Sequence, residues 1–286
     1  MKIINKISAV ILSFLMALFL FITALSLILT RTFSNPDFMI DVLEKRSYYD
    51  NIFLEYTDTV EHLAIPAGVP EGRFSSVISK AEFKKDINAV IFSAYSNTDG
   101  YAGEVIDYDT VYQKFYTCLT EVAIDNGFEI NDELIPGLEN VATLCAECYQ
   151  TYVTVPFIDT IGSYALEFDR YFLLAAVVFG VFFLFFLIFT FISKAYKNYS
   201  FYILAIGCNT VGFMMSIAPT AVFLSGKIRH INISVRSLYG FAVGYTESLL
   251  TTILICGIVF LMLGILLLVT KFLLDKRIKT YNINYN

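Results

Sequence analysis

The chain has 286 residues, of which 57% are hydrophobic and only 16% are charged, against roughly 25% charged residues in soluble domains. That composition excludes an ordinary soluble protein and indicates long segments that need lipid. Residues 31–170 carry 24 acidic and 9 basic residues, a net charge of −15, whereas the rest of the chain carries 2 acidic and 11 basic residues, a net charge of +9. An acidic surface repels phosphate groups, so we expect no nucleic-acid partner.

Four apolar segments are long enough to cross a bilayer, which takes about 20 helical residues. They are residues 7–30, 171–192, 201–224 and 248–271. The first has no charged residue over its whole length, which favours an uncleaved anchor over a secretory signal peptide. The lipid bilayer is therefore the first expected partner.

The orientation follows from the basic residues near the spans, because Lys and Arg resist translocation. Eight of them lie inside and four outside if both termini are cytoplasmic. The inner set is Lys2, Lys6, Lys194, Lys197, Lys271, Lys276, Arg277 and Lys279, and the outer set is Arg31, Lys227, Arg229 and Arg236. We therefore expect residues 31–170 and the basic loop 225–247 to be extracytoplasmic, and the tail 272–286 to be cytoplasmic.

The residue usage also indicates the kind of organism whose membrane this is. Lys, Asn, Ile, Tyr and Phe are frequent and Trp is absent, which is typical of an AT-rich genome. We expect a multi-pass protein of the cell membrane, specifically the plasma membrane of a bacterium.

Between the first two spans the apolar residues follow the helical period of 3.6. This pattern predicts one helix over residues 38–63, a second that begins at a capping box from Ser79 to Glu82, a third that opens after Asp109 and closes at Asn126–Gly127, and a fourth after Asp132. The expected fold class is all-α: a four-span helical membrane protein with an extracytoplasmic helical-bundle domain between spans one and two.

This layout resembles the ligand-binding bundles of bacterial transmembrane chemoreceptors over residues 7–192, without a shared motif. The resemblance implies a binding role for the outer domain. It ends at the second span, because the chain turns back after eight residues into the third span instead of entering a signalling module.

Three cysteines lie in the outer domain: Cys118, Cys145 and Cys148. The last two form a C-x-x-C, but they lie within a predicted helix with no strand–helix–strand pattern around them, so core packing is the first interpretation. A disulfide from Cys118 to Cys145 or Cys148 is the alternative. His62 and His230 fit no metal-ligand spacing, and we expect neither a metal nor a cofactor.

Small and polar residues recur in the last two spans at helical spacing, which lets helix backbones approach closely. The helix-packing candidates are Ala205, Cys208, Asn209, Gly212, Ser216, Gly240, Gly244, Ser248 and Thr252. They predict that spans three and four pack on each other, on a protein partner or on a second copy. Glu247 lies close to the outer end of span four, and we expect it to pair with Arg229 or Arg236 rather than to line a transport pathway.

The sequence contains no G-x-S-x-G, phosphate loop or dinucleotide fingerprint, so we expect no enzyme. The favoured function is a non-enzymatic binding or assembly component that uses its outer helical domain. One alternative is a permease-like subunit of an ABC-type exporter, since the order of one span, an outer domain and three spans is similar to permeases of the cell-division and macrolide-exporter type. A membrane enzyme of the cell envelope is a further alternative for which no residue can be named.

Overall fold

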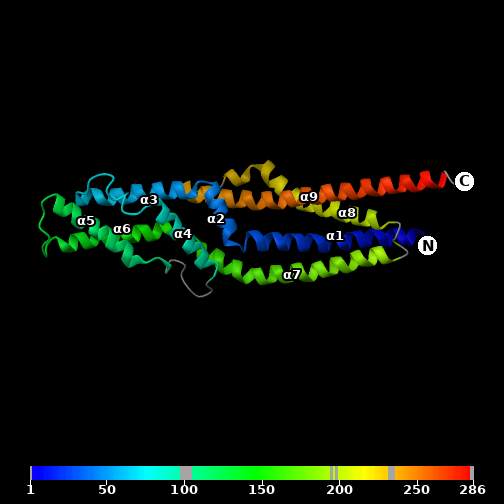
Figure 1. The fold of residues 1–286 in the computed structure, drawn as a ribbon, viewed down its shortest axis with the longest axis horizontal. Helices are drawn as coiled ribbons and strands as arrows, with labels where there is room; N and C mark the ends of the chain where they lie inside the picture. The colour runs from blue at the N-terminus through cyan, green and yellow to red at the C-terminus, as the bar shows by residue number, and fades with distance from the viewer. Residues whose placement is uncertain (1, 97–104, 194–195, 197–198, 231–235, 284–286) are drawn as a thin grey trace. The chain divides into compact units, whose positions relative to one another are not determined.

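The computed structural model describes residues 2–96, 105–193, 196, 199–230 and 236–283, with the side chains of residues 2–6, 229, 236 and 277–283 left out. The all-α class is confirmed, since 85% of the structure is helical and the described residues contain no strand. The chain forms two compact units (Figure 1). The apolar unit comprises Met1–Phe33, Phe168–Ile231 and Tyr245–Asn286, and the acidic unit comprises Ser34–Glu167 and Asn232–Gly244.

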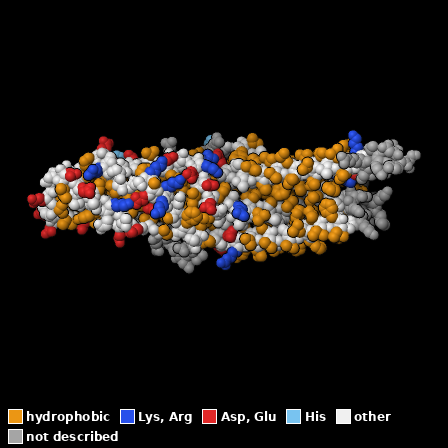
Figure 2. Space-filling model, viewed as in Figure 1, with side chains coloured by type: hydrophobic (Ala, Val, Ile, Leu, Met, Phe, Trp, Pro, Cys, Tyr) orange, Lys and Arg blue, Asp and Glu red, His pale blue; other side chains and the backbone are white. Residues whose placement is uncertain are grey.

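The apolar unit is built from long helices. It contains α1 (Lys2–Thr32), most of α7 (Ile158–Ile192), α8 (Ser200–Ser225), the short η3 (Lys227–His230) and most of α9 (Arg236–Ile283). Four helical segments are long and apolar enough to cross a membrane: Ile7–Thr32, Ile135–Ile192, Ser200–Ser225 and Ser237–Lys276. Each predicted span lies within one of them, and hydrophobic side chains dominate the visible surface of this unit (Figure 2).

Helix α1 packs against both α7 and α8 within the apolar unit. On one side the ring of Phe19 stacks on three phenylalanines of α7 with centroid distances of 5.5 to 5.8 Å. On the other side Ala17 and Ala24 form a buried cluster with Val211 and Met215 of α8. Large rings on one face and small residues on the other let α1 contact two neighbours at different distances.

The acidic unit consists of shorter helices with charged outer faces (Figure 2). They are α2 (Pro36–Lys45), α3 (Tyr48–Ala64), η1 (Ile65–Ala67), α4 (Lys80–Ala94), α5 (Tyr108–Asp125) and α6 (Ile135–Val153), together with residues 158–167 of α7 and 236–244 of α9. Both α3 and α5 contact α6. The rings of Tyr56, Phe83 and Tyr149 meet in the core of the acidic unit with centroids 5.0 to 5.7 Å apart.

The predicted helix over residues 38–63 is two helices, so this prediction is wrong. Helix α2 ends at Lys45, and Ser47 adopts a left-handed conformation with φ of 52° before α3 begins at Tyr48. The apolar spacing continues across the break because Met39 and Val42 before it and Tyr49 and Ile52 after it are all buried. Periodicity therefore could not reveal the bend.

The helix ends were predicted more accurately. The stop at Asn126–Gly127 is confirmed, with Gly127 at a φ of 81°. Ser79 caps α4 by accepting a hydrogen bond from the Glu82 N–H at 3.2 Å, while the Glu82 carboxylate pairs with Lys114 instead of returning to the cap. The third helix begins at Tyr108, since Asp107 rather than Asp109 is its cap.

Candidate binding groove

An open groove of about 880 Å³ runs along α5 in the acidic unit. One wall is the segment of residues 68–79, and the other is the exposed face of α5. Gln113, Thr117 and Cys118 of α5 line the groove, together with charged residues that include Arg73, Lys114, Asp109 and Glu121.

The wall formed by residues 68–79 has little regular secondary structure and is held by Glu61 of α3. The two carboxylate oxygens of Glu61 accept the backbone N–H of Gly72 at 3.1 Å and of Ser75 at 2.8 Å. Phe74 of the same segment is fully buried and meets the ring of Phe115 on α5 edge to face at 5.5 Å. A carboxylate on one side and a buried ring on the other thus keep this wall beside α5.

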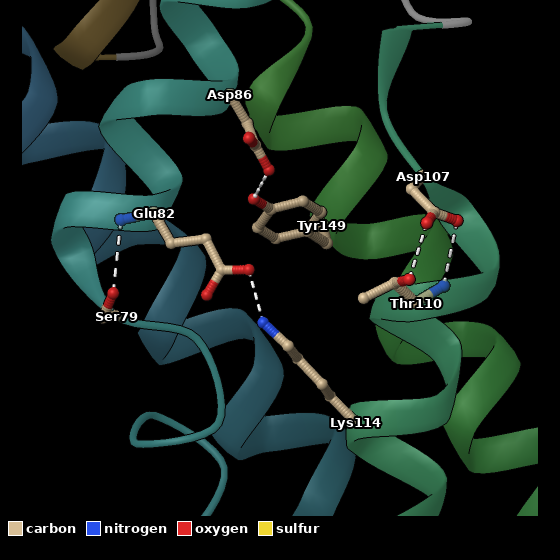
Figure 3. A network of polar contacts seen from close by, with 7 residues as sticks. All are labelled: Ser79, Glu82, Asp86, Asp107, Thr110, Lys114 and Tyr149. Atoms are coloured by element: carbon tan, nitrogen blue, oxygen red, sulfur yellow. Dashed lines mark hydrogen bonds and ion pairs between the residues drawn. The ribbon is translucent and has the colours of Figure 1, made fainter.

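Several charged groups of the groove have partners within the chain. The Arg73 guanidinium lies 3.8 Å from Glu121 and 3.6 Å from Asp125. Lys114 pairs with Glu82 of α4, and the Asp107 carboxylate accepts the backbone N–H of Thr110 at 3.1 Å and its hydroxyl at 2.6 Å (Figure 3). These hydrogen bonds from Thr110 lower the pKa of the exposed Asp107.

Exposed uncharged groups, chiefly the Gln113 amide and the Thr117 hydroxyl, lie between these pairs. The groove therefore offers a partner hydrogen bonding beside its charged groups. The groove also contains the half-buried Cys118 thiol, whose pKa is raised by burial and lowered to a smaller degree by Arg73. A protonated thiol is a poor nucleophile, so Cys118 as it lies here is not an activated thiolate.

Two tyrosine hydroxyls tie the core of the acidic unit to α4. Tyr149 of α6 donates to the carboxylate of Asp86 at 2.5 Å (Figure 3), and Tyr49 of α3 donates to the Asn88 side-chain oxygen at 2.5 Å. Burial, the hydrogen bond to Asp86 and the charge of this carboxylate raise the pKa of Tyr149. Asp86 and Asn88 thus join α4 to α6 and α3.

A second hollow of about 630 Å³ borders α3 and gathers acidic side chains, among them Glu55, Asp58, Glu61 and Glu71. Glu61 is the anchor of the groove wall. Glu55 accepts the backbone N–H of Ser237 at 3.3 Å and its hydroxyl at 2.8 Å, which places a carboxylate at the first turn of α9. Two of these acids are therefore occupied in holding other segments of the chain.

The three outer cysteines lie on neighbouring helices, Cys118 on α5 and the other two on α6. All three carry free thiols, and Cys145 is fully buried. Burial raises the pKa of Cys145 to about 12 and that of Cys148 to about 11. Among the described residues, no group of three His, Cys, Asp or Glu side chains could hold a metal ion. The disulfide stays a prediction.

Three of the helix-packing candidates of span three, Asn209, Gly212 and Ser216, lie where α8 meets α9. A Cβ at Gly212 would lie 2.8 Å from the carbonyl oxygen of Gly257, and a Cβ at Gly264 would lie 2.5 Å from the Asn209 side chain. Ser216 approaches Gly257 in the same way, with its hydroxyl 2.5 Å from the Cβ position. Ala205 and Cys208 are buried.

Gly240 and Gly244 of span four have other surroundings. Nothing lies within 4 Å of a Cβ at Gly240, and a Cβ at Gly244 would meet the Arg46 side chain at 2.7 Å. Thr252 bonds the Ser248 carbonyl at 2.9 Å on its own helix. The two glycines at which the α9 backbone comes close to α8 were missed: Gly257 and Gly264, seven residues or about two turns apart. A four-residue repeat drifts around a helix of 3.6 residues per turn, whereas a seven-residue interval stays on one face.

The expected ion pair of Glu247 stays a prediction. Glu247 lies on α9, and the side chains of Arg229 and Arg236 fall outside the described residues. Comparisons of the chain with protein-family models, with curated proteins and with solved structures find no significant match.

Proposed function

We propose that the chain is a non-enzymatic, multi-pass binding or assembly component of a bacterial plasma membrane, and that its acidic unit binds a partner outside the cytoplasm. The observation that supports this proposal best is the groove along α5. It is wide and open, its far wall is held by Glu61 and Phe74, and its exposed polar groups are not used by the core.

The chemistry of the groove favours recognition over catalysis. Arg73 and Lys114 are neutralised by carboxylates of the same chain, and the nearest thiol is protonated near neutral pH. A partner therefore gains hydrogen bonds and shape complementarity, with rim ion pairs adding about 1 kcal/mol or less each. A polypeptide surface, with its regular donors and acceptors, suits such a groove.

The proposed topology rests on charge. The eight basic residues beside the inner ends of the spans, against four at the outer ends, favour cytoplasmic termini. Residues 31–170, with a net charge of −15, are then extracytoplasmic, and the binding groove opens toward the cell exterior.

Site-specific photo-crosslinking in intact cells tests the binding role. A photoreactive residue replaces Gln113 in the groove or, as a matched control, Gln150 on the exposed face of α6. We expect a discrete crosslinked product from position 113 and none from position 150. Equal products from both positions, or none from position 113 in a correctly inserted protein, would contradict the groove as the binding surface.

Thiol labelling of intact cells tests the topology separately. A membrane-impermeant maleimide is added to cells that express Thr151→Cys or Lys276→Cys, and the gain over the wild-type signal is measured. We expect a gain for Thr151→Cys alone, and a gain for Lys276→Cys alone would reverse the orientation. Co-purification of an ATPase in mild detergent would favour the permease-like alternative, and hydrolysis of an envelope polymer would favour the enzyme.

A further inference from the structure

The turn between α5 and α6 exposes three large apolar side chains to solvent. We define this tip as residues 124–133. Ile124 is 59% exposed, Phe128 62% and Ile130 37%, although such residues are usually buried. Grouped apolar exposure of this kind on a soluble surface marks an interaction site more often than chance.

The tip is a built turn, so the exposure is not that of a frayed end. Helix α5 closes with paired hydrogen bonds from Phe128 N–H to the Ala123 carbonyl at 3.0 Å and from Gly127 N–H to the Ile124 carbonyl at 2.9 Å. This pattern is the Schellman motif, which needs the positive φ of Gly127. The Asn131 side chain then accepts the backbone N–H of Leu134 at 3.0 Å and leads into α6. The backbone therefore holds Phe128 and Ile130 in water.

Carboxylates alternate with the apolar residues along the tip. Asp125, Glu129, Asp132 and Glu133 lie within the tip, and the tip contains no basic residue. Asp125 pairs with Arg73 at 3.6 Å. Within the described part of the chain, the other three carboxylates have no ion-pair partner. The tip thus combines an apolar centre with an uncompensated negative rim.

We propose that the tip of residues 124–133 docks a cationic amphipathic segment of another protein, with apolar residues on one face and Lys or Arg beside them. Apolar burial against Phe128 supplies affinity, and the rim of Glu129, Asp132 and Glu133 selects the positive charge. Anionic headgroups and nucleic acids would be repelled by the same rim. The inference rests on the proposed binding function and names a class of partner, but it uses a surface separate from the floor of the groove.

The test uses the full-length protein in neutral detergent and a fluorescent peptide of about 18 residues, five helical turns, in which Lys and Leu alternate at amphipathic spacing. Binding is measured by anisotropy at low and high salt, beside a Glu–Leu peptide of the same pattern. We expect the Lys–Leu peptide alone to bind, and raising the salt from about 0.05 to 0.5 M to weaken it about tenfold or more.

Two variants locate the contact. Phe128→Ser combined with Ile130→Ser should weaken binding about tenfold at either salt concentration. Glu129→Gln combined with Asp132→Asn and Glu133→Gln should weaken it mainly at low salt and flatten its salt dependence. Leu144→Ser and Glu139→Gln, exposed positions on α6, are the matched controls and should bind as the wild type does.

Several outcomes would overturn the proposal. They are equal binding of both peptides, loss of binding in the α6 controls, or an effect of the tip variants on self-association alone, which would make the occupant a second copy. A large fall in the melting temperature of the Phe128→Ser variant would also overturn it, since the side chain would then belong to the core. A crosslink at Gln113 with no effect of the tip variants would leave the proposed function intact and remove only this surface.

Discussion

The core of the acidic unit and the contact of α8 with α9 in the apolar unit pack helices with different residues. The acidic unit buries large rings, such as Tyr56, Phe83 and Tyr149, and joins its helices through tyrosine hydroxyls that donate to side chains of α4. The contact of α8 with α9 in the apolar unit instead uses Gly212 and Gly257, where the backbones meet directly. In water the removal of apolar area drives packing, whereas lipid is as apolar as the side chains and leaves close van der Waals contact as the main source of stability.

The largest expected effect comes from emptying the aromatic core. Phe83→Ala should lower the free energy of unfolding of the acidic unit by about 3–5 kcal/mol, because the ring is fully buried between Tyr56 and Tyr149. The measurement is the rate at which a thiol reagent reaches the buried Cys145 of the full-length protein. Phe92→Ala, an exposed position on the same helix, is the control and should leave the rate unchanged. Similar rates for both variants would show that the buried Phe83 ring stabilises the acidic unit no more than an exposed ring does, and the contrast with the glycine contact of α8 and α9 would be lost.

The next effect tests the close approach of helix backbones. Gly257→Ala should destabilise the contact of α8 with α9 by about 1–3 kcal/mol, because the new methyl group would meet the Gly212 carbonyl oxygen at 3.0 Å and the Ser216 hydroxyl at 2.5 Å. Unfolding in mixed micelles measures the change. At Gly240, where a Cβ meets nothing within 4 Å, the same substitution should be neutral or stabilising by up to about 1 kcal/mol. A neutral Gly257→Ala would show that side chains, and not backbones, set this distance.

A smaller effect concerns the side-chain hydrogen bonds in the core of the acidic unit. Tyr149→Phe should cost about 1–2 kcal/mol, because Asp86 loses a hydrogen-bond donor in a partly buried site. A urea titration of the full-length protein, read by circular dichroism, gives this difference.

The same variant predicts a dependence on pH. The pKa of Tyr149 is raised in the folded state, whereas an unfolded tyrosine ionises near pH 10, so the folded protein holds the extra proton at higher pH. Stability is therefore complete below about pH 10 and falls as the pH rises above it, by up to about 1.4 kcal/mol per pH unit for one proton. Tyr149→Phe should fall less steeply than the wild type. Parallel curves would mean that this hydroxyl does not titrate with unfolding.

The smallest expected effect tests a local element of the acidic unit. Ser79→Ala should cost about 1 kcal/mol, because the Glu82 N–H loses its cap at the start of α4. Ser76→Ala, an exposed serine of the groove wall, should change stability by less than about 0.5 kcal/mol. Equal costs at both positions would indicate that the serine hydroxyl at the α4 cap has no special role, and urea titration distinguishes the two outcomes.

Some features were predictable because they depend on neighbours in the chain. Helical spacing and turn residues predicted the stop at Gly127 and the start near Ser79, since caps involve residues only a few positions apart. The break at Ser47 was not predictable, because both sides of it keep the same apolar spacing and only contacts with other helices distinguish them. The groove was not predictable either, because its wall depends on Glu61 and Phe74 reaching partners many residues away.

The amino-acid sequence by itself determined the all-helical class and the four segments that are apolar enough to span a membrane, because both follow from local composition and period. Only the tertiary structure decided which small residues of α9 reach α8, which acids hold the chain together, and which apolar side chains stay in water at the tip. The physical reason is that local backbone preference acts within a few residues, whereas burial and pairing depend on segments that meet only after folding.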